Sequence, residues 1–167
     1  MKFGRVALIL VAATALQFFV GGSRYRAAWP VDCFLIATAI AARGGNSSRA
    51  VLVGGVLGFL EDAFAHELLG MSAFAKALLG YILAVLSVRV VFGGAWAVGG
   101  ALAAASLVND GIVGLLSLVL LRAPLVLFSR ESLWRAAATG MTGGALEAAR
   151  KFPWREWWKR RVHGRLR

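Results

Sequence analysis

Long uncharged apolar runs constrain the fold of this chain more than any other feature. Two of them, Val6–Ser23 and Val90–Asn109, reach about 18 residues, the length that by itself indicates a membrane-spanning helix. The chain is 59% hydrophobic and 16% charged, and its mean hydropathy is +0.72. A soluble domain of 167 residues cannot bury that much apolar surface. The composition therefore predicts one all-α integral membrane domain, which we place at residues 1–150.

The apolar pattern predicts a bundle of six transmembrane helices, some of which must be short or must tolerate a charge. The N-terminal run is interpreted as an uncleaved first helix, because it is longer than the usual apolar region of a signal peptide and no small-residue cleavage site follows. The expected spans are Val6–Val20, Pro30–Ala42, Ala50–Ala65, Met71–Val91, Ala95–Leu120 and Ser132–Ala149.

The distribution of Lys and Arg predicts the orientation of the bundle. If both termini are cytoplasmic, most of the 19 cations fall on the inner side, as the positive-inside rule requires. The turn around residues 66–70, which carries Glu67 and no basic residue, then faces outward. We therefore expect a multi-pass membrane protein with its N- and C-termini in the cytoplasm. The inner cations outside the tail are Lys2, Arg5, Arg43, Arg49 and Arg89, and the outer ones are Arg24, Arg26, Arg122, Arg130 and Arg135.

Residues 151–167 form a basic, aromatic tail, which accounts for much of the net charge of +11. Aromatic residues interleaved with cations at a membrane boundary are typical of an anchor on anionic lipid. The charge is therefore not interpreted as a nucleic-acid signature. A docking segment for a cytoplasmic protein is the alternative. The residues expected to contact lipid are Trp154, Trp157, Trp158, Lys159, Arg160 and Arg161.

Three charges, Glu61, Asp62 and Lys76, lie within the apolar stretch Val51–Phe92. A charge at bilayer depth costs roughly 2.5–3.5 kcal/mol on insertion scales, so it is retained where it faces protein, water or a partner. One possibility is a buried acid that pairs with Lys76 across the turn or binds a cation or proton; the other is a solvated pair of acids at the outer membrane edge. An ion pair of one of these acids with Lys76 is the more specific expectation.

Two further acids and several small residues complete the candidate sites. Asp110 follows Asn109 in the middle of the fifth span, where we expect it to hydrogen-bond Asn109 or a neighbouring helix. Asp32 is expected only to cap the start of the second helix. Small-residue spacings favour close helix packing, within the chain or with a partner helix. They are Gly54-x-x-x-Gly58, Ala95-x-x-x-Gly99 and Gly140-x-x-Gly143-Gly144.

Motifs for catalysis and for cofactor or metal binding are missing from the sequence. There is no GxSxG elbow, no P-loop and no HExxH. Cys33 is the one cysteine, and His66 and His163 lie far apart, so no zinc or haem spacing occurs. We expect a protein that is not an enzyme and that has no cofactor.

The order of these features resembles MreD, the rod shape-determining membrane protein family of bacteria. The similarity extends over about residues 5–150. It rests on the first span ending in Leu16-Gln17, on Pro30-Val31-Asp32 before the second, and on Val108-Asn109-Asp110 in the fifth. The central tract is similar to a signature of G…GF…D…G…GY; its residues here are Gly54, Gly58, Phe59, Glu61, Asp62, Gly70, Lys76, Gly80 and Tyr81.

This resemblance implies a non-enzymatic scaffold of the cell-wall elongation machinery in the bacterial inner (cytoplasmic) membrane. Its implied partners are an MreC-like single-span protein, the filament protein MreB, RodA and a class B penicillin-binding protein. The family is similar in fold to the substrate-binding subunits of energy-coupling-factor vitamin transporters, so a small-molecule uptake subunit is the rival. Such a subunit requires a polar cavity rimmed by aromatic residues. The candidate outer aromatics are Tyr25, Trp29 and Trp134.

Overall fold

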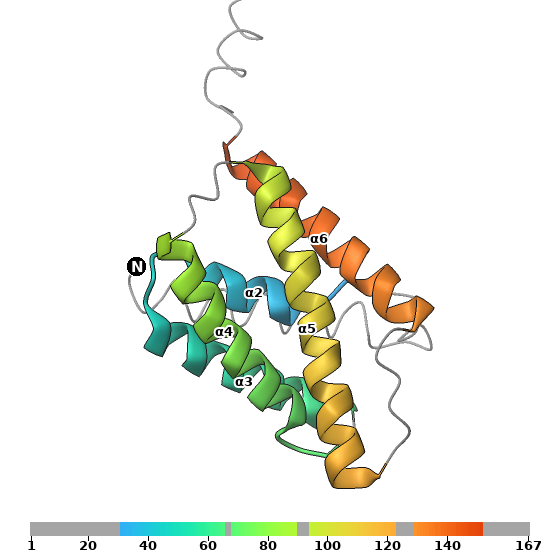
Figure 1. Cartoon of the computed structure of the whole chain (residues 1–167). Helices are drawn as coiled ribbons and strands as arrows, with labels where there is room; N and C mark the ends of the chain where they lie inside the picture. Colours follow the sequence, from blue (N-terminus) through green and yellow to red (C-terminus); the bar gives the residue numbers. More distant parts are fainter. Residues whose placement is uncertain (1–30, 66–67, 90–93, 123–128, 152–167) are drawn as a thin grey trace, which may run out of the picture.

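The computed structural model describes residues 31–65, 68–89, 94–122 and 129–151, and every regular element in these ranges is an α-helix (Figure 1). The expected first span, Val6–Val20, and the basic, aromatic tail lie outside the described residues. The described helices are α2 (Cys33–Ala42), α3 (Ser47–Ala65), α4 (Met71–Arg89), α5 (Ala95–Leu121) and α6 (Arg130–Lys151). Their bounds follow the expected spans to within about three residues.

Helix α2 begins after Asp32, whose Oδ1 accepts a hydrogen bond from the N–H of Leu35 at 2.8 Å. Pro30, the expected first residue of this span, lies outside the described residues. The helix ends at Ala42, Arg43 after it is extended, and glycines 44 and 45 then turn the chain with positive φ. Ten helical residues span about 15 Å, roughly half of a bilayer core. Helix α2 is therefore one of the short helices that the apolar pattern predicts.

Helices α3 and α4 form an antiparallel hairpin with very close backbones. Gly54 and Gly58 on α3 face the backbone of α4 so closely that a Cβ atom at either position would overlap it. Gly80 of α4 faces the backbone of α3 equally closely, since a Cβ atom at this position would lie 2.5 Å from the carbonyl oxygen of Ala50. The turn between the helices ends at Gly70, whose φ of +109° favours glycine.

Helices α5 and α6 form a second antiparallel hairpin, again joined through small residues. A Cβ at Gly99 would lie 2.9 Å from the carbonyl oxygen of Gly140, and a Cβ at Gly140 would lie 2.7 Å from that of Gly99. The small-residue spacings in the sequence thus mark contacts within this chain at both hairpins. Arg122, with φ 53°, follows the last residue of α5.

Helix α2 packs beside both hairpins, mainly against α3 and α4 and more lightly against α5 and α6 (Figure 1). Phe34 and Leu35 of α2 are fully buried and belong to two apolar clusters, Phe34 to one with Leu57 of α3 and Leu35 to one with Leu79 of α4. The two hairpins contact each other chiefly through α4 and α5. The core is therefore centred on α2, whose short length leaves it enclosed by the longer helices.

Two described helices are long and apolar enough to cross a membrane. These are Met71–Val88 within α4 and Ala95–Leu121, the whole of α5. Helix α3 carries three charges, Arg49, Glu61 and Asp62, α2 is short, and α6 contains several charges, so none of them meets that criterion. The described part of the chain is therefore all-α, with two candidate spans by length and composition alone.

Candidate functional site

A lysine buried between two carboxylates lies at the centre of the molecule. Lys76 of α4 has no exposed side-chain surface, and its Nζ lies 3.0 Å from Asp32 Oδ2 and 2.5 Å from Glu61 Oε2. Asp32 starts α2 and Glu61 is in the last turns of α3, so one cation holds three helices together. We call these three residues the lysine triad. The expected ion pair of Lys76 with one of the two adjacent acids is present, and Glu61 is that acid. The role of Asp32 in the triad was not predicted.

The lysine triad joins the two hairpins as well as the three helices. The backbone N–H of Asp32 donates to Thr139 Oγ1 on α6 at 3.0 Å, while its side chain reaches Lys76 on α4. Thr139 is fully buried. Removal of one member of a buried ion pair typically costs several kcal/mol, since the remaining charge is left without compensation. The triad therefore fixes the relative positions of α2, α3, α4 and α6.

Asp62, next to Glu61, does not pair with Lys76. It is fully buried, and its carboxylate accepts hydrogen bonds from the backbone N–H groups of Gly70, Ser72 and Ala73 at 2.8, 3.1 and 3.4 Å. These donors lie at the start of α4, where a helix has free N–H groups and a partial positive charge. Since Gly70 has no side chain to cap the helix, Asp62 of α3 supplies the cap.

The remaining residues of the central tract lie at or beside the contact between α3 and α4. A Cβ at Gly54 would meet the carbonyl oxygen of Lys76, so this glycine allows α3 to approach at the residue that carries the triad lysine. Gly58 allows the same approach near Ser72, beside the Asp62 cap. Tyr81 is half-exposed on α4 and takes no part in either cluster. The tract is thus the contact between α3 and α4, with Tyr81 on its outer side.

Asp110 of α5 has only loose polar contacts. Asn109 Nδ2 lies 3.5 Å from its Oδ1, and Arg135 Nη1 on α6 lies 3.8 Å from the same oxygen. Its second oxygen, Oδ2, is buried without a hydrogen-bond partner, as is Oδ1 of Asn109. The expected contacts with Asn109 and a neighbouring helix are present, yet they leave two buried acceptors unsatisfied.

These acceptors adjoin a polar cavity of about 340 Å³, which we call the polar pocket. Its charged side chains are Glu61, Asp110, Glu131 and Arg135, contributed by α3, α5 and α6. Four serine hydroxyls also line it, from α4, α5, α6 and the residue before α6: Ser72, Ser117, Ser129 and Ser132. No aromatic side chain is among the described residues of its lining.

A third ionic cluster lies where the ends of α2 and α6 meet. Glu147 is almost fully buried, and its carboxylate contacts Arg43 at 2.7 Å, Arg150 at 2.9 Å and Lys151 at 3.7 Å. Arg43 follows α2, so this contact joins residues that are distant in the sequence. The spacing of Glu147 to Arg150 and Lys151 is readable from the sequence as a helical pair. Nothing in the sequence indicated the contact with Arg43.

Comparison of the chain with protein-family models, curated proteins and solved structures found no match. Among the described residues, no group of three or more His, Cys, Asp and Glu side chains is placed to hold a metal ion. The described helices therefore present two kinds of polar feature. Buried ion pairs hold the helices in position, and one polar pocket is available to a ligand.

Proposed function

We propose that this protein is a non-enzymatic membrane scaffold of the MreD kind, which holds the transmembrane helix of a single-span partner in the bacterial inner membrane. In this proposal the chain has six spans, with both termini in the cytoplasm. By association with an MreC-like protein it helps to position peptidoglycan synthases of the elongation machinery. Support comes from the sequence resemblance and from the properties of α5.

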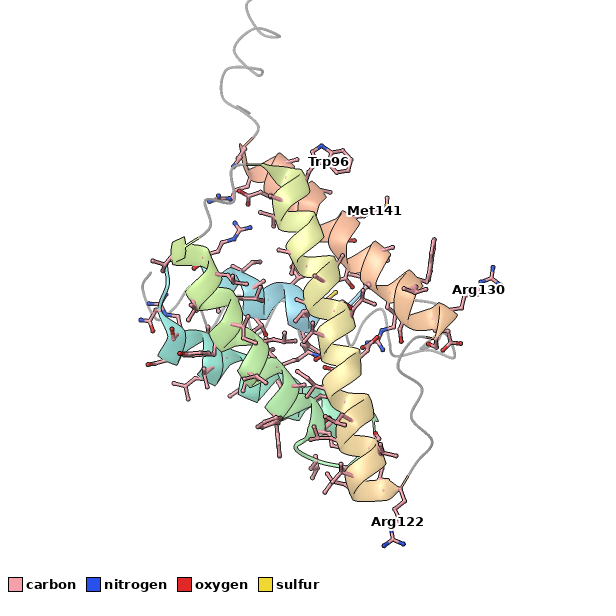
Figure 2. All side chains as sticks on the ribbon, in the orientation of Figure 1. Trp96, Arg122, Arg130 and Met141 are labelled. Atoms are coloured by element: carbon pink, nitrogen blue, oxygen red, sulfur yellow. The ribbon has the colours of Figure 1, made fainter. Side chains whose placement is uncertain are left out.

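The observation that carries the proposal is the uncovered apolar surface of α5. Only 17% of its residues are buried, compared with 44% in the span of α4. The side chain of Trp96 is 94% exposed and projects away from the bundle, as does Met141 on the neighbouring α6 (Figure 2). Such a surface would be strongly unfavourable in water, whereas lipid or another apolar helix would cover it.

The interior supports a scaffold for a different reason. The lysine triad, the Asp62 cap and the glycine contacts fix α2, α3 and α4 relative to one another. A rigid body that exposes one long apolar helix has the form expected of a platform for helix association. The residues that resemble the MreD signature then serve to build this platform, and α5 serves to contact the partner.

Site-specific cross-linking tests the proposal. A photoreactive p-benzoylphenylalanine replaces Leu115 or Val119 on α5, both well exposed, in a chain co-expressed with an MreC-like single-span protein. We expect cross-links from both positions to the transmembrane segment of that protein. Leu52 on α3 is the matched control, because it is equally exposed and apolar but lies on another helix. It should give little cross-linking.

Two results would contradict the proposal. Equal cross-linking from Leu52 and Leu115 would indicate non-specific contact in the membrane. Cross-links from α5 to residues 1–30 of the same chain, with none to the partner, would show that the chain covers this helix itself.

The polar pocket favours a second candidate function, a substrate-binding subunit for small-molecule uptake. The polar pocket lies beside the start of α6, at the end of the bundle that the charge distribution places outside. Trp134, one of the expected rim aromatics, is exposed and is not in the described lining, and Tyr25 and Trp29 lie outside the described residues. Co-purification with a pair of ATPase subunits, in place of a single-span protein, would support this alternative.

A further inference from the structure

We infer that the polar pocket binds an alkylammonium group, held by Asp110 and Asn109. The inference does not depend on the scaffold proposal, since it rests on the lining of the polar pocket and not on the surface of α5. Its starting point is an unusual deficit: two buried oxygen acceptors, Asp110 Oδ2 and Asn109 Oδ1, have no donor within the described structure.

Burial makes this deficit costly. Asn109 is only 3% exposed, and a buried polar atom without a partner destabilises a protein because its hydrogen bond to water is lost and not replaced. Asp110 carries a charge in the middle of an apolar helix, and the cation that the described residues place near it is Arg135, 3.8 Å away with a side chain that is 42% exposed. Folding tolerates such groups where something else donates to them.

The balance of charge in the lining identifies the missing donor as a cation. Glu61 is already paired with Lys76, so the other described charges of the lining are Asp110, the exposed Glu131 and one cation, Arg135, whose guanidinium lies 3.8 Å from Asp110. Outside the lysine triad, the described lining therefore has one more carboxylate than cation, which disfavours an anionic ligand. A primary ammonium supplies one positive charge and three N–H donors, enough for Asp110 Oδ2, Asn109 Oδ1 and a serine hydroxyl.

Size and donor type separate an organic ammonium from a metal ion. The described residues provide no group of three acidic, histidine or cysteine side chains for a metal. A cavity of 340 Å³ holds about ten waters at roughly 30 Å³ each, far more room than one ion needs. An ammonium head on a short carbon or hydroxylated chain fits this volume. It can be a free amine or the headgroup of an aminophospholipid.

Thermal unfolding of the full chain in phosphatidylcholine nanodiscs tests the free-amine source. The probe is n-butylammonium chloride, and tetramethylammonium chloride at equal concentration is the control cation, because it has no N–H donor. We expect a saturable rise in unfolding temperature of about 3–6 °C when n-butylammonium is roughly ten times its dissociation constant. Tetramethylammonium should have no saturable effect.

A second arm tests the lipid source of the ammonium group. It replaces part of the phosphatidylcholine with phosphatidylethanolamine and measures the change in unfolding temperature in the same way.

Variants show whether the effect arises in the polar pocket. Asp110→Asn should abolish the rise, and Asn109→Leu, which keeps Asp110, should abolish most of it if the first variant does not fold. Glu147→Gln is the matched control, since it also converts an acid to an amide but lies in the separate cluster with Arg43. It should keep the full rise.

The outcomes separate clearly. A rise in the n-butylammonium arm that requires Asp110 or Asn109 assigns a free amine, and one confined to the phosphatidylethanolamine arm assigns a lipid headgroup. The inference is overturned if neither arm produces a rise, if both cations act alike, or if the variants of the polar pocket respond as Glu147→Gln does.

Discussion

Replacement of Lys76 by methionine tests whether the lysine triad holds the structure together. Methionine has a similar length and is accommodated in apolar interiors, so the change removes the charge with little change of shape. Asp32 Oδ2 and Glu61 Oε2, at 3.0 and 2.5 Å from the lysine nitrogen, would then lose their common cation. Loss of one partner from a buried ion pair costs about 3–5 kcal/mol. Two acids depend on this lysine, so we expect a value towards the upper end of that range.

The assay is unfolding of the full chain in a mixed micelle by increasing amounts of SDS, followed by helical circular dichroism. Arg130→Met is the matched control, because Arg130 is an exposed cation at the start of α6 that projects from the bundle (Figure 2). It should change stability by less than about 0.5 kcal/mol.

A triple variant distinguishes a charge effect from a packing effect. Lys76→Met combined with Asp32→Asn and Glu61→Gln removes all three charges together, and such neutral replacements of buried ionic groups are often well tolerated. We expect it to regain most of the stability lost in the single variant. The reasoning is refuted if Lys76→Met behaves like Arg130→Met, or if the triple variant is less stable than the single one.

Two further predictions concern the contact between α3 and α4. Gly54→Ala should destabilise the chain by about 1–3 kcal/mol in the same SDS titration, since the new methyl group overlaps the carbonyl of Lys76. Gly100→Ala is its control, because there is open space at its Cβ, and it should be neutral or stabilising by up to about 1 kcal/mol. Asp62→Ala should cost about 1–2 kcal/mol and increase amide hydrogen exchange at the start of α4 while leaving its centre protected. Uniform exchange along α4 in this variant would show that the Asp62 carboxylate is not a local cap.

The sequence predicted the positions of the described helices well, because apolar length and interruptions by charge or glycine are local signals. Gly70 marked the turn before α4, and the run from Ala95 gave α5 almost to the residue. The length of each helix is a less local property. Helix α2 is apolar but has only ten residues, because the Asp32 cap begins it and the glycine turn follows its end.

The polar contacts were predicted only where the partners are close in sequence. Glu61 and Lys76 flank one turn, so their pairing followed from helix geometry. Asp32 precedes a helix, so capping alone explained its presence in the sequence, and its ion pair with Lys76 was not predicted. The contact of Arg43 with Glu147 depends on how α2 meets α6. The spacing of residues along one sequence does not indicate which helices distant in the chain will contact each other.

The order of the lysine triad along the chain has a consequence for biosynthesis. Asp32 and Glu61 emerge from the ribosome before Lys76, so both acids are synthesised before the cation that they share. Transfer of an unpaired acid into lipid is costly. If the chain is inserted as the proposed scaffold requires, α2 and α3 therefore gain their ion pairs only when α4 has been made. In that case we expect the three helices to become stable together, as a trio in which one lysine is shared by two acids.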